Sequence, residues 1–580
     1  MATPAPQTRT SAIPAPRREL TPRAVVTAVL VAALMGASFP YVVLKIGYGP
    51  NISVVAAFFG YIALAFATAI SGVKSSRYEN NLAEAAGTAA GQTGFMCVVL
   101  AAIDMLNARP ELGFSLHLSS LQIFLWLTCA GLLGALLAST LRRHYIDEEN
   151  LTFADGTAAG ETLVVLYEGK KTAAAQLRAL SSGMGISALV SFVRDGPWKL
   201  IPAEIPFGAG GAALRMGSEV SVLSFGAGLL VGLRVTLSMA IGMIAAWVIA
   251  PGALVGRGWV AHATFNEVLR WVMWPATGLM VAGGLTALAL KWNLIVKTFA
   301  SLGAKDVRRD DEFPIRWVVV GASTMAVLLA LVQYVSLGFP LWLSAVSLVV
   351  SIPLMLVGTR VLGETNWAPI SALANLTQAI FAALAPGHLP INMVGSGMSG
   401  TIAGQGEHLM QDYRAAKIIG TSPRKVTYLQ LVGVPVGAAA LSIVYPALRD
   451  RYGFTGDGAL TSPISQKWAA FAELLAKGFD QLPTGALAAL VVALVLGVVL
   501  TLGEPKVKWA PSPTAIGLGM LIPGYAVLPM VAGGLVQAIW ARANPKSETT
   551  YSTAVASGFI AGEALLVLGF AILAVFGIRF

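Results

Sequence analysis

Hydrophobic runs of roughly 20 residues recur along almost the whole chain, and each is long enough to cross a bilayer as one α-helix. Charged residues make up only 12% of the sequence, against about 25% in a soluble domain. The clear runs are 24–46, 51–72, 118–140, 174–194, 315–336, 340–362, 425–447, 484–502 and 551–577, and longer Gly-interrupted stretches cover 219–250, 269–300 and 512–540. We therefore expect an all-α polytopic membrane protein with about 14–16 transmembrane helices.

Several local patterns of the first half return in the second. Glu79-Asn80-Asn81 and Glu364-Thr365-Asn366 each follow two hydrophobic runs, and Gly226, Gly232 and Gly242 align with Gly519, Gly524 and Gly534 after one single-residue shift. Such duplicated halves are typical of secondary transporters. We divide the chain into a disordered tail (1–21), a first transmembrane repeat (22–301), an inter-repeat loop (302–314) and a second transmembrane repeat (315–580).

Glycines cluster beside the polar motifs, as in 391–407. Close packing of helices through small residues is one explanation. The segment is also too Gly-rich and too short for an ordinary span, so we expect a broken or re-entrant helix there, near the centre of the protein.

The net charge of +10 reflects bases at the ends of the spans. Bases flank the start of each half: Arg9, Arg17, Arg18 and Arg23 in the first, and Lys305, Arg308, Arg309 and Arg316 in the second. By the positive-inside rule we expect both clusters, and the N-terminus, in the cytoplasm, which predicts parallel repeats and no nucleic-acid partner. For 17–38 a helix is favoured over a cleaved signal peptide, because the apolar run continues to Lys45.

The energy source must be an ion gradient or a partner subunit, because the sequence lacks a Walker A loop: Val164 stands where the early glycine before Gly169-Lys170-Lys171-Thr172 is required. Coupling to protons needs a carboxyl group inside the membrane, where each charge is costly. The acids in or near apolar runs are Glu79, Glu84, Asp155, Glu161, Glu364, Glu407, Asp412 and Glu563. Glu79, Glu364, Glu563 and Glu161 are our candidates for proton coupling, and a position in the headgroup layer is the alternative for several acids.

A zwitterionic substrate needs a cation for its carboxylate and amides for its other polar groups. Arg234 lies inside an apolar run, and Lys45 lies near the end of another. The substrate-binding candidates are Lys45, Asn80, Asn81, Arg234, Asn366 and Gln405. Snorkelling of the cations to the interface and bridging of helices by the amides are the alternatives.

One polar segment is the most specific motif in the chain: Met410-Gln-Asp-Tyr-Arg-Ala-Ala-Lys-Ile-Ile-Gly420-Thr-Ser-Pro-Arg-Lys425. It resembles the signature of the oligopeptide transporter (OPT) family, which includes the yellow-stripe-like metal-chelate transporters. Further segments resemble the family's patterns: Tyr41-Val-Val-Leu-Lys45-Ile-Gly47, Phe153-Ala-Asp-Gly156-Thr-Ala-Ala-Gly-Glu161, Gly228-Leu-Leu-Val-Gly232-Leu-Arg234 and Ala556-Ser-Gly558 through Gly562-Glu563. The resemblance covers about 22 to 577.

The chain also departs from the family's pattern. Ala154 stands where the family has a proline, and the Asn-Pro-Gly and Lys-Ile-Pro-Pro-Arg motifs of the eukaryotic peptide branch are missing. The chain is more similar to prokaryotic members, which implies a location in the bacterial inner membrane. The resemblance implies proton-coupled import of di- to tetrapeptides or glutathione-like compounds, with metal-chelate import as the alternative.

No cofactor or bound metal is expected, because the five histidines and two cysteines form no ligand pattern. The expected partners are a small solute, protons, lipid and a second copy of the chain. Two other classes stay open at this stage. A passive channel is one, and an intramembrane serine protease is the other, because Gly397-Met398-Ser399-Gly400 matches the short Gly-x-Ser-Gly pattern.

Overall fold

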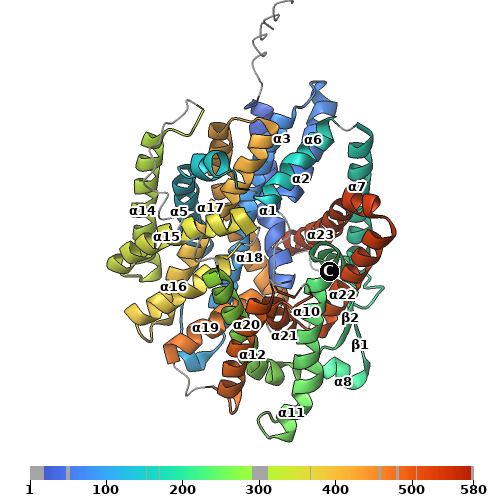
Figure 1. The fold of residues 1–580 in the computed structure, drawn as a ribbon, viewed down its shortest axis with the longest axis vertical. Helices are drawn as coiled ribbons and strands as arrows, with labels where there is room; N and C mark the ends of the chain where they lie inside the picture. The colour runs from blue at the N-terminus through green and yellow to red at the C-terminus, as the bar shows by residue number, and fades with distance from the viewer. Residues whose placement is uncertain are drawn as a thin grey trace, which may run out of the picture.

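The computed structural model describes residues 19–575 except 47–51, 152, 169, 291–310, 366–367, 455–458, 461, 478–481, 505 and 508. The described part is almost wholly helical (Figure 1). The helices of the first half are α1 (Pro22–Ile46), α2 (Ile52–Ser71), α3 (Arg77–Phe95), α4 (Cys97–Asn107), α5 (Ser120–Ser139), α6 (Ala154–Glu168), α7 (Lys170–Asp195), α8 (Gly208–Ala213), α9 (Val222–Val231), α10 (Leu233–Met243), α11 (Ala250–Gly256) and α12 (Phe265–Leu290).

The helices of the second half are α14 (Ile315–Leu337), α15 (Leu341–Thr365), α16 (Ile370–Leu384), α17 (Leu389–Ile419), α18 (Pro423–Tyr452), α19 (Pro463–Lys477), α20 (Ala486–Gly503), α21 (Pro513–Leu521), α22 (Gly524–Ala543) and α23 (Pro545–Val575). Three short helical turns complete the set, η1 (Pro110–Leu112), η2 (Arg143–Glu148) and η3 (Ile244–Ile249). In the described part of the chain, 12 helices are long and apolar enough to cross a membrane. The all-α polytopic fold expected from the sequence is confirmed.

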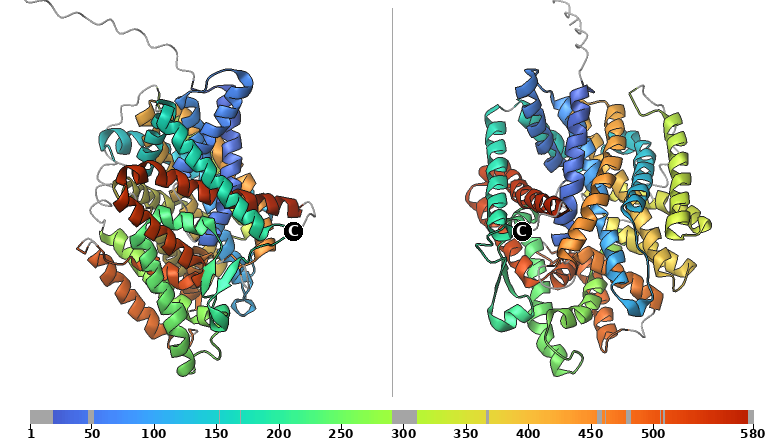
Figure 2. Two further views of the ribbon diagram at one scale, coloured as in Figure 1. Left: turned by 90° about the vertical axis from the view of Figure 1, so that its right-hand side faces the viewer. Right: turned by 180° about the vertical axis from the view of Figure 1, so that it is seen from behind.

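Helices α1, α3 and α18 lie between two flanks of the molecule (Figures 1 and 2). One flank carries α14, α15 and α16, and the other carries α7, α22 and α23. Helix α3 packs against α1, α2, α17 and α18 and is buried from Glu79 to Gly94. Since this helix is rich in amides, acids and glycines, its burial places polar groups at the centre of an otherwise apolar protein.

The glycine-rich segment 391–407 does not form a broken or re-entrant element. It lies inside α17, one uninterrupted helix of 31 residues. Its glycines face bulky side chains of other helices: a Cβ on Gly395 would lie 2.5 Å from the Phe381 ring, and one on Gly397 would lie 2.9 Å from the Trp126 ring. Close packing through small residues therefore explains these glycines, and the expectation of a break was wrong.

The breaks occur in two other helical pairs, within the Gly-interrupted runs 219–250 and 512–540. Helices α9 and α10 are separated by Gly232, whose φ of 86° favours glycine. Helices α21 and α22 are separated at Ile522-Pro523, where the proline lacks the N–H that a continuous helix needs. The two pairs cross, with α9 packed on α22 and α10 packed on α21.

A short antiparallel hairpin leads into the first broken pair. Strand β1 (Glu204–Pro206) pairs with β2 (Gly217–Glu219), with Ile205 opposite Ser218. The chain then passes through Ser221, which caps the N-terminus of α9. This order places Glu219 and Ser221 beside the end of a broken helix, where backbone N–H groups are left without intrahelical partners.

Candidate functional site

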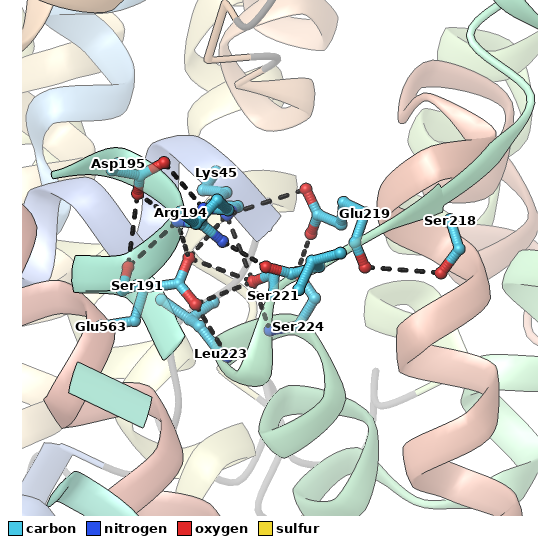
Figure 3. Close-up of polar contacts among 11 residues, drawn as sticks. Lys45, Ser191, Arg194, Asp195, Ser218, Glu219, Ser221, Leu223, Ser224 and Glu563 are labelled. Carbon is cyan, nitrogen blue, oxygen red and sulfur yellow. Dashed lines mark hydrogen bonds and ion pairs between the residues drawn. The ribbon is translucent and has the colours of Figure 1, made fainter. Parts of the chain in front are cut away.

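A cluster of ionic side chains surrounds Glu563, and we call it the ion-pair cluster: Lys45, Arg194, Asp195, Glu219, Ser221 and Glu563 (Figure 3). Glu563 lies on α23 and is 1% exposed. Lys45 Nζ donates to its Oε1 at 2.8 Å, and Arg194 Nη2 donates to the same oxygen at 3.2 Å. A carboxylate so deeply buried needs such partners, because an unpaired charge would be far more costly there.

The broken helix α9 supplies the other half of the Glu563 environment. Ser221 Oγ donates to Glu563 Oε2 at 3.0 Å, and the Leu223 backbone N–H donates to it at 3.1 Å. These donors sit at the helix N-terminus, where the helix dipole favours a negative charge. Four donors from α1, α7 and α9 therefore converge on one carboxylate of α23.

The cluster also holds acids beyond Glu563. Arg194 lies at the end of α7, where its Nε donates to Asp195 Oδ1 at 2.7 Å and its Nη1 donates to the Val220 carbonyl at 2.6 Å. Lys45 Nζ lies 3.7 Å from Glu219 Oε2, and the Lys45 side chain keeps 14% of its surface exposed. The Lys45 to Glu219 pair is thus the longest contact of the cluster, and both of its side chains are more exposed than Glu563.

A second buried polar group, which we call the amide–carboxyl network, joins α3, α17 and α18. It consists of Asn81, Glu84, Gln405, Asp412 and Gln430, all at most 2% exposed. Asn81 Nδ2 donates to Glu84 Oε2 at 2.9 Å, and Gln405 Nε2 donates to Gln430 Oε1 at 3.0 Å. Gln430 Nε2 donates to Asp412 Oδ2, and the Asp412 and Glu84 carboxyl groups neighbour each other.

The remaining sequence candidates lie apart from these two groups. Glu79 completes a capping box with Ser76 at the start of α3 and pairs with Arg23 Nη2 at 2.7 Å. Asn80 donates to the Ala57 carbonyl at 3.2 Å, which bridges α3 and α2. Glu161 is exposed on α6.

Arg234 binds the segment between α20 and α21. Its Nε donates to the Ala510 carbonyl at 2.9 Å, and its Nη2 lies 3.1 Å from Glu504 Oε1. Partial burial raises the pKa of Glu504, and Arg234 opposes that shift. Asn366 and the side chain of Glu364 lie outside the described residues, so their place in the site stays a prediction.

The structure therefore brings together Lys45 and Glu563 in one group, and Asn81 and Gln405 in the other. Sequence reasoning did not select Arg194, Glu219 or Gln430. The only available signal for Arg194 was a charge pair with Asp195 at the end of an apolar run, a pattern also typical of the headgroup layer. Ser399, the serine of the Gly-x-Ser-Gly pattern, shares a hydrogen bond of 2.9 Å with Ser351 Oγ.

A family model described as OPT oligopeptide transporter protein matches residues 19–574. The chain belongs to this family. It is therefore an integral membrane transporter and not an enzyme, as the resemblance of residues 410–425 and of the other motifs implied.

Similar proteins are named for two kinds of transport. The metal-nicotianamine transporter YSL2 of Arabidopsis thaliana is 23% identical over 97% of this chain and 94% of that protein. The metal-nicotianamine transporter YSL1 of the same plant is 28% identical over 32% of this chain and 29% of its own length. The Saccharomyces cerevisiae protein YGL114W, whose name assigns it to the oligopeptide transporters, is 26% identical over 59% of this chain and 56% of its own length.

Proposed function

We propose that this protein is a proton-coupled secondary importer of a small zwitterionic solute, namely a metal chelate of the nicotianamine class. The observation that carries the substrate class is the match with the metal-nicotianamine transporter YSL2, because it extends over 97% of this chain. Such a chelate presents carboxylates and amines together, so its site needs both cations and acceptors.

The ion-pair cluster offers this combination of charges. Lys45 and Arg194 can bind carboxylate oxygens of the chelate, while Glu219 can accept an N–H hydrogen bond from a metal-bound amine. The Lys45 to Glu219 contact of 3.7 Å is the longest in the cluster and is the one that a substrate carboxylate displaces most easily. Of the residues expected to hold substrate, Lys45 is therefore the first that we assign to it.

A metal that arrives already chelated needs no cage of protein ligands. The described part of the chain contains no group of three or more His, Cys, Asp or Glu side chains that could hold a metal ion. A transporter of bare ions uses such ligands to select the metal. Recognition of the organic part of the complex is compatible with this set of side chains.

A proton gradient suffices as the energy source. One proton moving through 100 mV yields about 2.3 kcal/mol, which supports roughly a 50-fold accumulation of a neutral complex. Buried carboxyl groups at the centre of a membrane protein are the groups that such coupling uses. An inward gradient makes the protein an importer.

Uptake into proteoliposomes tests this function directly. Purified protein is reconstituted, an acidic outside pH is imposed, and uptake of radioactive nickel is followed with and without nicotianamine. We expect accumulation of the nickel–nicotianamine complex above equilibrium, its collapse on addition of a protonophore, and no uptake of free nickel. Uptake that stops at equilibrium under the pH gradient would make the protein a passive channel.

A small peptide is the second candidate substrate, favoured by the family description and by the yeast relative. The same proteoliposomes distinguish a peptide from a metal chelate as the substrate, when unlabelled di- to tetrapeptides are added together with the nickel–nicotianamine complex. Inhibition by a peptide, together with accumulation of that peptide when it is labelled, would assign the site to peptides. A peptide that neither competes nor accumulates leaves the chelate as the substrate.

A further inference from the structure

The amide–carboxyl network contains more hydrogen-bond acceptors than donors. Four of its oxygens are buried and receive no hydrogen bond: Asn81 Oδ1, Glu84 Oε1, Gln405 Oε1 and Asp412 Oδ1. Each carboxyl group accepts one bond from an amide, through Glu84 Oε2 and Asp412 Oδ2, and has its second oxygen unsatisfied. A buried group without its partner is costly, so the excess of acceptors indicates a missing donor or cation.

No basic side chain of the described residues forms an ion pair with Glu84 or Asp412. Three cations on the packed helices are engaged elsewhere: Arg23 with Glu79, Arg360 with Glu149, and Lys425 with Glu19. Arg414 and Lys417, further along α17, both bind Asn150 Oδ1. Two adjacent carboxylates without a cation repel each other, and one of them then retains a proton.

The space around the pair favours the smallest cation. Helices α3 and α18 approach backbone to backbone, since a Cβ on Gly433 would lie 2.3 Å from the Ala86 carbonyl oxygen. One turn further, a Cβ on Gly437 would lie 2.5 Å from Ala90 Cα. Helices packed this closely beside the two acids leave little room for a hydrated metal ion, whereas a proton needs no additional space.

We infer that Glu84 of α3 and Asp412 of α17 share one proton and form the proton-binding site of the transporter. The protonated carboxyl donates its O–H to the other carboxylate, which supplies the missing donor for two oxygens at once. The inference rests on the proposed proton-coupled function and names its site. Both residues were among the eight acids in or near apolar runs that the sequence offered, but neither was among the four selected from them for proton coupling.

Loss of this proton changes how α3 and α17 interact. The hydrogen bond between the acids disappears, and two negative charges face each other in a site without a cation. Separation of α3 from α17, with entry of water, relieves that repulsion. The protonated dyad therefore stabilises the packed arrangement, and its deprotonation favours a more open one, which links proton release to movement of the central helices.

Other titratable groups also lie on the elements packed here. Tyr413 follows Asp412 and shares a hydrogen bond with Thr427, and Glu407 lies just over one turn earlier on α17. The elements that pack around α3 and α17 carry further titratable side chains. Among them are Arg23 and Tyr41 (α1), Tyr61 (α2), Cys129 (α5), Asp147 (η2), Asp155 and Glu161 (α6), Arg360 (α15), His408 (α17), Arg424 and Lys425 (α18) and Lys467 (α19).

Substitution of each acid by its amide tests the dyad in two ways. The first readout uses nickel–nicotianamine in proteoliposomes, where pH-driven accumulation is compared with counterflow exchange, which needs no gradient. We expect Glu84→Gln and Asp412→Asn to keep counterflow and to lose accumulation, from roughly 50-fold to none. The double variant should behave like either single variant, because one shared proton is lost in all three.

The second readout needs no substrate. Infrared spectra of purified protein at acidic and alkaline pH show the C=O band of a protonated carboxyl group, which should disappear at alkaline pH in the wild type. This pH-dependent band should be missing in Glu84→Gln and in Asp412→Asn. It should persist in the matched control Glu407→Gln, which removes a buried acid of the same helix that has no hydrogen-bond partner among the described residues.

The outcomes separate the dyad from the proposed function. A titrating band that survives in both dyad variants when Glu407 is also replaced by Gln, or coupled accumulation that survives in both, overturns the dyad. Loss of coupling in Glu407→Gln alone places the proton at Glu407 and also overturns it. If wild-type protein shows the expected band but never accumulates the nickel complex or a peptide, the dyad stands and the proposed function fails.

Discussion

At the scale of single residues, Glu563 shows how this protein keeps a charge inside an apolar helix. Lys45, Arg194, Ser221 and the Leu223 N–H all donate to its carboxylate. The sequence predicted a role for Glu563, because an acid within an apolar run stands out. Its partners could not be predicted, since Arg194 lies beside an acid at a helix end and meets Glu563 only through the fold.

Removal of Lys45 should expose the cost of this buried charge. We expect Lys45→Met to destabilise the protein by about 3 kcal/mol, because Glu563 keeps Arg194 but loses its closest cation. Thermal unfolding of the purified protein measures this loss. Lys45→Met combined with Glu563→Gln should recover part of it, since the two changes are coupled. If the double variant is as unstable as the two single changes added together, the pair does not act as a unit.

At the scale of elements, small residues determine how closely the central helices approach. The sequence indicated both possibilities for the glycines of 391–407, and the structure shows that they pack against rings such as Phe381 and Trp126. A run of glycines is compatible with a break or with close packing, and only the neighbouring helices decide between the two. The breaks at Gly232 and Ile522-Pro523 fell in runs already recognised as interrupted, but the pairing of α9 with α22 could not be foreseen.

The contact between α3 and α18 should tolerate no added methyl group. We expect Gly433→Ala to destabilise the protein by about 1–3 kcal/mol, because its Cβ would lie 2.3 Å from the Ala86 carbonyl oxygen. Gly185→Ala in α7 is the matched control, since a Cβ there meets nothing within 4 Å. Unfolding of the two variants in detergent gives the comparison. An equal effect of both substitutions would mean that helix propensity, and not packing, determines the result.

At the scale of the whole molecule, the outer surface matches a lipid environment. Helix α14 exposes large apolar side chains along its length, including Val319, Val327 and Val335, and α15 exposes Val349. The polar groups are gathered inside instead, in the ion-pair cluster and in the amide–carboxyl network. Composition alone predicted this arrangement in outline, because charged residues are few. The division into two repeats and the orientation in the membrane remain proposals.

The position of the bases predicts that orientation. We expect the N-terminus and the loop 302–314 on the same, cytoplasmic face, as the positive-inside rule requires. Single cysteines placed at each position in a cysteine-free protein, with Cys97 and Cys129 replaced, report their side by labelling of right-side-out vesicles with a membrane-impermeant maleimide. Both should react only after the vesicles are opened. Labelling of one of them in intact vesicles would exclude parallel repeats.

The ion-pair cluster has a consequence for the order in which the protein is synthesised and inserted into the membrane. Lys45 and Arg194 emerge from the ribosome early, whereas the carboxylate that joins them belongs to the final helix, α23. Until α23 is inserted, Lys45 and Arg194 lack Glu563, the carboxylate that pairs with both of them. Docking of α23 therefore completes the ion-pair cluster, because Glu563 then pairs with both cations.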